Sequence, residues 1–175
     1  RVLFRSAAWY LPEERQLTTT EQMLDEMCAA LGGRAAEEVF FKKISTGALS
    51  DLEKVTKMAY AMVSMYGLNK KIGNISYYDS SGQQSGFVKP YSENRAQFID
   101  NEVSKIIEEQ YNRAKKLLIK YKEKVKNLAS ELLQNEVIFK SDLEKIFGER
   151  KWKSYEEEKL DEIDRKSNTS VKISS

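Results

Sequence analysis

The sequence reads LGGRAAEEVFF over residues 31–41 and, three residues later, STGALSD over residues 45–51. In the first part, Ala35 and Val39 recur at the spacing of one helix face. The second part holds the small and hydroxylated residues of a turn, and it ends on a carboxylate. We therefore predict a helix, then a turn, then a second helix that carries Asp51 on its first turn.

Two adjacent glycines, Gly32 and Gly33, interrupt the first helical pattern. A glycine inside a helix weakens it by about 1 kcal/mol relative to alanine. The pair therefore marks either close packing inside one long helix or a break between two helices. We favour close packing, which predicts that alanine at either position destabilises the fold by about 1–3 kcal/mol.

The flanking segments also follow helical periods. Thr18 and Glu21 fit a capping box, in which two side chains satisfy free amides at a helix start. The helix after this box should bury residues spaced by three and four: Met23, Leu24, Met27, Ala30 and Leu31. The helix after Asp51 should end at Gly67 and bury one face: Leu52, Val55, Ala59, Met62 and Tyr66.

The carboxy-terminal half predicts one long helix and one short helix. The long helix should begin after Ser92, with a possible break within residues 123–127. Its apolar stripe consists of Ile99, Val103, Ile106, Leu117, Tyr121, Val125 and Leu128. The short helix should begin with a capping box from Ser141 to Glu144 and end at Gly148. Short strands are predicted at residues 10–12, before Pro12, and at residues 72–78.

These patterns predict a mainly α fold with little β structure. Residues 7–150 form the predicted domain, residues 1–6 stay unmatched, and residues 151–175 form a polar tail with the composition of a disordered segment. Because the chain begins with Arg1 rather than methionine, we expect it to be a piece of a longer protein.

Composition excludes several classes of function. There are 29 Lys and Arg against 27 Asp and Glu, and no basic stripe with interleaved aromatics, so we expect no nucleic-acid partner. No apolar run reaches the roughly 20 residues of a membrane span, so this segment should itself be soluble. The chain has no histidine, and Cys28 is its single cysteine. Histidine-dependent catalysis is therefore impossible with these residues alone.

Three carboxylates are candidates for chemistry. Asp51 either caps its helix and complements the dipole, or it ligates a metal, because zinc accepts carboxylate oxygen. Glu37 and Glu38 are adjacent on a helix and so point in different directions, which excludes a paired acid and base. They lie either on a solvated face or, for one of them, beside a metal ligand. The lysines of residues 115–126 form the solvated face of an amphipathic helix.

Residues 31–41 resemble the Leu-Gly-Gly-Arg-x-x-Glu-Glu helix of FtsH-type proteases. Residues 45–52 resemble the Thr-Gly-Ala-x-x-Asp-Leu segment of the same family. Further short matches lie at residues 10–12, 19–22, 65–69 and 72–76. Residues 89–93 (KPYSE) are most similar to the mitochondrial m-AAA branch. The resemblance covers about residues 8–150.

The resemblance implies that Asp51 is the third protein ligand of a catalytic Zn²⁺ ion. In this family the other two ligands are histidines of an upstream His-Glu-x-x-His helix, whose glutamate activates water. That helix is not in this chain, so we predict no catalytic residue here and no bound cofactor besides an incomplete zinc site. ATP and Mg²⁺ would bind a separate upstream module.

The resemblance further implies a homo- or hetero-hexamer of AAA protease subunits in the mitochondrial inner membrane. Its substrates would be unfolded or membrane proteins, and only segments outside this chain would contact the membrane. The alternatives are a non-catalytic paralogue that assembles with active subunits and a helical assembly module. The sequence preceding Arg1 distinguishes among these possibilities.

Overall fold

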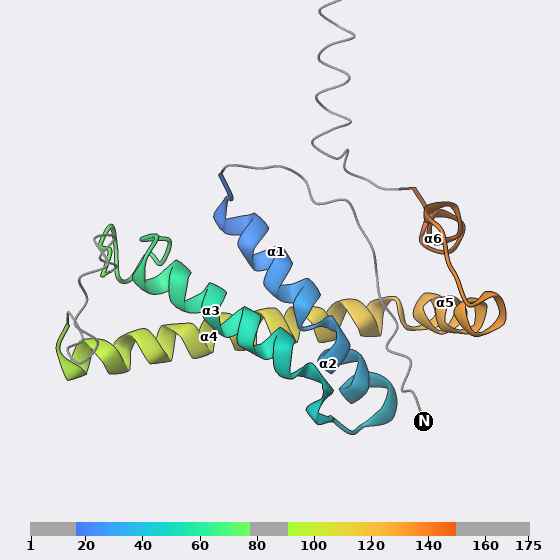
Figure 1. Cartoon of the computed structure of the whole chain (residues 1–175), viewed down its shortest axis with the longest axis horizontal. Helices are drawn as coiled ribbons and strands as arrows, with labels where there is room; N and C mark the ends of the chain where they lie inside the picture. Colours follow the sequence, from blue (N-terminus) through green and yellow to red (C-terminus); the bar gives the residue numbers. More distant parts are fainter. Residues whose placement is uncertain (1–16, 78–90, 150–175) are drawn as a thin grey trace, which may run out of the picture. The chain divides into compact units, whose positions relative to one another are not determined.

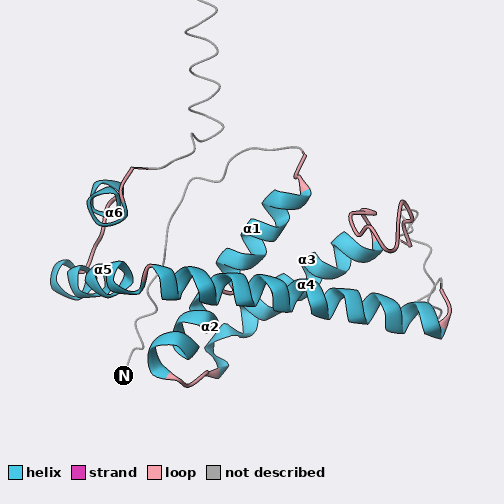
Figure 2. Ribbon diagram, turned by 180° about the vertical axis from the view of Figure 1, so that it is seen from behind, coloured by secondary structure: helices cyan, strands magenta, loops and turns pink. Residues whose placement is uncertain are grey.

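The computed structural model describes residues 17–77 and 91–149 (Figure 1). The chain divides into two units, one of Thr18–Lys126 and one of Arg1–Leu17 with Asn127–Ser175. The described residues form helices and no strand (Figure 2), which confirms the mainly α fold. The strand predicted at residues 10–12 and the polar tail at residues 151–175 lie outside the described residues.

Helix α1, Thr20–Ala30, starts with a capping box one residue later than predicted. Thr19 Oγ1 accepts a hydrogen bond from the Gln22 amide at 3.3 Å, and Gln22 Oε1 accepts one from the Thr19 amide at 2.8 Å. The predicted box of Thr18 and Glu21 is therefore wrong. Glutamate and glutamine both serve at the fourth position, so the sequence contains two overlapping boxes, and the structure uses the second.

The two glycines do not mark close packing. Helix α2, Gly32–Ala36, follows α1 through Leu31, which keeps a right-handed helical conformation. The Leu31 amide donates to the Met27 carbonyl, and the Ala35 amide donates to the Leu31 carbonyl, both at 3.0 Å. A Cβ atom placed on either glycine would meet nothing within 4 Å beyond its immediate helix backbone. The prediction of close packing at these positions is wrong.

A π-helix, η1 (Glu37–Phe41), ends at Lys42, whose φ of 57° is left-handed. The 3₁₀ turn η2, Thr46–Ala48, then leads directly into α3, Leu49–Ser64. Helix α3 ends three residues before the predicted stop at Gly67, which has a left-handed φ of 63° in the turn that follows. Tyr66 is 59% exposed, so its predicted place in the core is wrong. Helical spacing no longer applies to it because α3 has already ended at Ser64.

The predicted strand at residues 72–78 is wrong over its described part, residues 72–77. Asn69 Oδ1 accepts hydrogen bonds from the amides of Lys71 at 2.9 Å and Ile72 at 3.2 Å. Gly73 adds a positive φ of 81°. These side-chain bonds turn the backbone, because an Asn side chain competes with regular pairing for the same amides.

Helix α4, Glu93–Lys120, is capped by Ser92 as predicted, since Ser92 Oγ accepts from the Arg95 amide at 3.4 Å. Helices α3 and α4 lie side by side (Figures 1 and 2), and the Tyr60 hydroxyl of α3 donates to Asp100 of α4 at 2.6 Å. The predicted break occurs at Tyr121, two residues before the expected range. The apolar stripe is buried at Ile99 and Val103 but not along its whole length, because Leu117 is 44% exposed.

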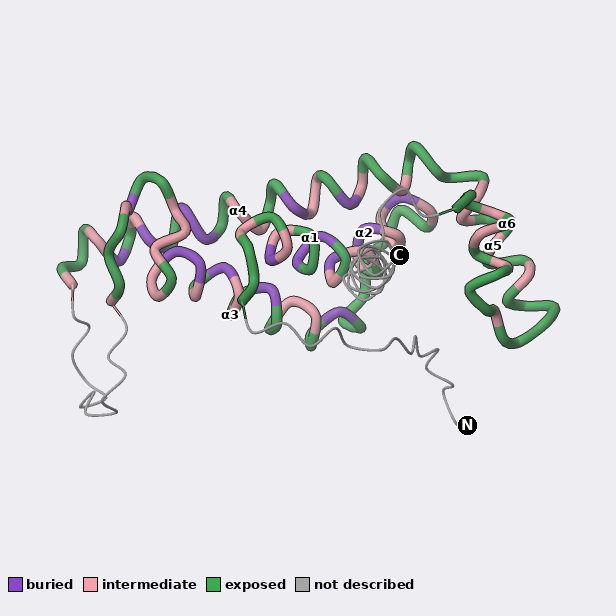
Figure 3. Tube along the Cα trace, turned by 90° about the horizontal axis from the view of Figure 1, so that it is seen from above, coloured by how far each residue is buried: buried purple, intermediate pink, exposed green. Residues whose placement is uncertain are grey.

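The core of the first unit lies where α1, α3 and α4 meet, along the purple segments of Figure 3. Its buried residues are Met23, Met27, Leu31, Val55, Ala59, Met62, Val63, Ile72, Ile99 and Val103. A smaller cluster joins α1, α2 and α4 through Cys28, Ala35 and Ala114. Of the ten positions predicted to be buried on the first two helices, six are in the larger set, and Leu24, Ala30 and Leu52 are partly buried against it.

Helices α5, Lys122–Asn135, and α6, Lys140–Phe147, contain no buried residue in the part that the structure describes. The Asp142 carboxylate accepts from the Phe139 amide at 3.1 Å, so α6 starts before Ser141 and the predicted box from Ser141 to Glu144 is wrong. Ser141 already lies inside the first turn. Gly148, with φ of 91°, ends α6 as predicted.

Candidate functional site

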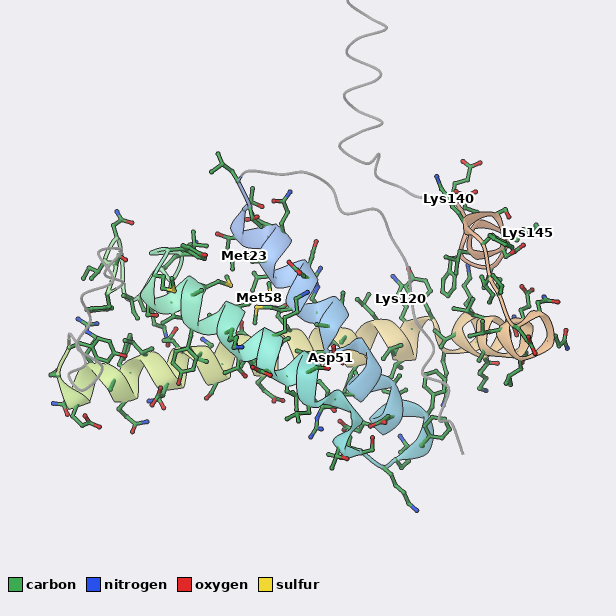
Figure 4. The ribbon with its side chains drawn as sticks, viewed as in Figure 1. Met23, Asp51, Met58, Lys120, Lys140 and Lys145 are labelled. Carbon is green, nitrogen blue, oxygen red and sulfur yellow. The ribbon has the colours of Figure 1, made fainter. Side chains whose placement is uncertain are left out.

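Asp51 is the third residue of α3 and is labelled on its first turn in Figure 4. Its side chain is half-buried and makes no hydrogen bond or ion pair with the described residues. The residue preceding the helix is Ala48, which has no capping side chain. Asp51 therefore complements the helix dipole without capping the helix, and its carboxylate oxygens are available to a further group.

Glu37 fixes the turn that leads to Asp51. Its Oε2 accepts the Ser45 amide at 2.8 Å, and its Oε1 accepts the Ser45 hydroxyl at 2.6 Å. The Ser45 hydroxyl oxygen in turn accepts the Gly47 amide at 3.2 Å. One carboxylate on η1 thus holds the first residue of the turn, six residues before Asp51. The two hydrogen bonds to Ser45 also lower the pKa of Glu37, because they favour the charged form.

Glu38 connects η1 to α4 instead. It accepts a short hydrogen bond from the Tyr111 hydroxyl and lies 3.5 Å from Lys115 Nζ. The Tyr111 hydrogen bond, and after it the Lys115 charge, lower the pKa of Glu38. Burial, followed by the bond to Glu38, raises the pKa of Tyr111 to about 12. The neutral phenol is therefore a stable donor at ordinary pH.

The two adjacent glutamates have different partners, since Glu37 accepts hydrogen bonds from Ser45 and Glu38 accepts one from Tyr111. Neither is simply a solvated residue, because each binds a different element. Sequence patterns missed Ser45 and Tyr111 as their partners. The signal for Ser45 was its place before Thr46 and Gly47, where a hydroxyl commonly caps a turn. No local signal pairs Tyr111 with a residue 73 positions earlier.

A third carboxylate holds the loop after α3. Glu102 is 8% exposed, accepts a hydrogen bond from Asn69 Nδ2 at 3.1 Å, and forms a short ion pair with Lys71. The bond to Lys71, and then the bond to Asn69, lower its pKa. Glu102 has its partners within the described residues, so its role is to fix residues 69–72 against α4.

The described residues contain no group of three or more His, Cys, Asp or Glu side chains able to hold a metal ion. Asp51 fits one position of a zinc site, because a carboxylate is a zinc ligand and this one, on the first turn of α3, has no competing partner among the described residues. Since the sequence has no histidine, the usual nitrogen ligands would have to come from outside this chain.

No helix in the described part of the chain is long and apolar enough to span a bilayer.

Comparison with known proteins identifies a family and several relatives. The model of the family described as Peptidase family M41 matches residues 2–146, a span that includes residues 2–6, which the motifs left unassigned. An ATP-dependent zinc metalloprotease FtsH of Parabacteroides distasonis is 60% identical over 93% of this chain and 24% of its own length. The FtsH of Karelsulcia muelleri is 52% identical over 80% of this chain and 23% of its own length.

A mitochondrial relative is less similar. The mouse mitochondrial inner membrane m-AAA protease component AFG3L2 is 46% identical over 82% of this chain and 18% of its own length. The chain thus spans about a quarter or less of each of these relatives. Because the family model covers most of the chain and ends within α6, this chain belongs to peptidase family M41.

Proposed function

We propose that this chain is the carboxy-terminal part of the peptidase domain of an FtsH-type, ATP-dependent zinc metalloendopeptidase. The observation that carries the proposal is the Asp51 carboxylate at the start of α3, which follows the turn that Glu37 fixes and has no partner among the described residues. Its relatives are named ATP-dependent zinc metalloproteases, and it matches them over most of its length.

In this proposal Asp51 supplies one oxygen ligand to zinc, and Glu37 keeps Asp51 in place through Ser45. A zinc ion held there by Asp51 and by ligands outside this chain would supply Lewis-acid chemistry, acting on bound water and on a peptide carbonyl. Asp51 contributes negative charge and orientation. Two histidines and the glutamate of an upstream His-Glu-x-x-His helix would complete the site.

The full-length protein would assemble as a homo- or hetero-hexamer and degrade unfolded or membrane proteins. ATP and Mg²⁺ would bind its separate ATPase module. Residues 89–93 and the mitochondrial relatives support the mitochondrial inner membrane as its location. The higher identity to the Parabacteroides protein, 60% against 46%, favours a bacterial membrane instead. The genome that encodes the chain decides between the two locations.

The test is Asp51→Asn in the full-length protein, with proteolysis, ATP hydrolysis and zinc content measured on the same preparation. Asparagine keeps the size of the side chain but removes its charge, so we expect loss of most proteolysis and zinc with ATP hydrolysis retained. Glu53→Gln is the matched control, because it removes a carboxylate from the same helix at an exposed position. Parental proteolysis with unchanged zinc in Asp51→Asn would refute the assignment.

A further inference from the structure

A basic groove lies between η1 and the carboxy-terminal half of α4, within the first unit. It has a volume of about 660 Å³, and it is lined by the paired Glu38 and Lys115 together with Val39, Lys42, Asn112, Lys116 and Ile119. A second hollow of about 480 Å³ adjoins it along α4 and shares Asn112 and Lys116 with it. Its other lining residues are Glu109, Arg113, Leu117 and Lys120. The zinc site proposed above uses none of these residues.

The groove combines available positive charge with exposed apolar surface. Lys42 and Lys116 form no ion pair with any described residue, whereas Lys115 is bound to Glu38 and Arg113 to Asp25. Ile119 is 61% exposed and Leu117 is 44% exposed, although both lie beside these charges. Apolar surface bordered by unpaired lysines suits an amphipathic acidic helix laid into the groove.

The sequence of this chain contains one segment of that chemistry. Residues 152–164 carry six carboxylates and two lysines. At 100° per residue, Trp152, Tyr155, Leu160 and Ile163 fall within an arc of about 140°. Carboxylates flank this arc: Glu157 and Asp164 on one side and Glu162 on the other. On a helix of this sequence, the apolar arc would be buried by a partner that covers it.

We propose that the groove of one copy binds residues 152–164 of a neighbouring copy as a helix. The choice of a second copy rests on the oligomer of the proposed function. Each copy has one groove and one acidic segment, so the contact is head-to-tail, and repeated contacts of this kind close into a ring when the rotation permits. The lysines set the orientation and the rate of association, and the apolar arc provides the buried area.

The experiment is photo-crosslinking of full-length protein with benzoylphenylalanine in place of Lys116, using mixed ¹⁴N- and ¹⁵N-labelled subunits. We expect crosslinks to residues 152–164 that join a light and a heavy chain. The matched control carries the photo-crosslinker in place of Lys70, another exposed lysine without an ion pair among the described residues. Crosslinks only within one copy, or only to other segments or lipid, would overturn the proposal.

Charge reversal provides the second arm. Asp161→Lys with Glu162→Lys in the acidic segment should lower the crosslink yield about tenfold, because attraction to the groove becomes repulsion. An unchanged yield would also overturn the proposal. Running the same crosslinking in the Asp51→Asn protein separates the two questions, since the groove contact should persist there whether or not Asp51 binds zinc.

Discussion

Replacing Gly33 by alanine should stabilise this fold, which reverses the prediction from sequence. Gly33 lies inside α2 with a right-handed backbone, and a Cβ atom there meets no atom of another element within 4 Å. Alanine therefore adds no clash and keeps the hydrogen-bond ladder between Leu31 and Ala35. The substitution stabilises the fold mainly by lowering the conformational entropy of the unfolded chain.

The magnitude follows from helix propensity. Alanine is better than glycine inside a helix by about 0.5–1 kcal/mol. For a domain of this size, 1 kcal/mol raises the melting temperature by about 2–4 °C. We therefore expect Gly33→Ala to raise the melting temperature by about 1–4 °C, and Gly32→Ala, at the first residue of α2, to give a smaller rise in the same direction.

The assay is thermal and urea unfolding of the whole chain, followed by circular dichroism at 222 nm. Gly67→Ala is the informative control, because Gly67 has φ of 63°, where an L side chain costs about 1–2 kcal/mol. It should lower the melting temperature while Gly33→Ala raises it. A lower melting temperature for both Gly32→Ala and Gly33→Ala would mean that a Cβ atom does not fit at these positions. It would then favour the original prediction of close packing.

Four further outcomes are expected. Glu37→Gln in full-length protein should lower zinc affinity about 10- to 100-fold, because it disturbs Ser45 and the turn before the proposed zinc ligand. ATP hydrolysis should not change; metal analysis and phosphate release measure the two quantities. Unchanged zinc affinity would contradict this role of Glu37. Glu102 has a pKa below its ordinary 4.5, so its contribution to stability is complete above that value and is lost as pH falls through the folded-state pKa. The melting temperature should therefore fall less steeply with decreasing pH in Glu102→Gln than in the parent. An identical slope would mean that the bonds from Glu102 to Asn69 and Lys71 do not contribute to stability. Met27→Ala, at a fully buried position, should cost about 2–5 kcal/mol in urea unfolding, and a cost below 1 kcal/mol would mean that α1 packs elsewhere. The chain alone should neither cleave peptides nor retain stoichiometric zinc after dialysis, and tight zinc binding by the isolated chain would oppose the proposed site.

Helical spacing and caps predicted the elements that pack on the core. Met27, Val55 and Ile99 are fully buried as their periodicity indicated, because one face of each amphipathic helix must leave water. Ser92 begins α4 and Gly148 ends α6 as expected, since capping depends on residues within one turn. These features depend on neighbours a few residues away, and a sequence shows such neighbours directly.

The features that sequence reasoning missed depend on distant partners or on small differences in hydrogen bonding. The strand predicted at residues 72–78 failed because Asn69 captures two amides that a strand would have used. Close packing at Gly32 failed because composition does not show what lies opposite a glycine. The position of Asp51 was predicted, but its support by Glu37 required the turn to be folded.

The π-helix η1 has a consequence for how related sequences should vary in length. A π-turn holds one residue more than an α-helical turn, and here it places Glu37 toward Ser45 while Glu38 faces Tyr111. Deleting one residue from η1 would rotate the following backbone by about 100° and separate one of these pairs. Residues 42–44 are all exposed and bind neither partner. Insertions and deletions in homologous chains should therefore gather at residues 42–44 and spare residues 37–41, which an alignment of relatives can test.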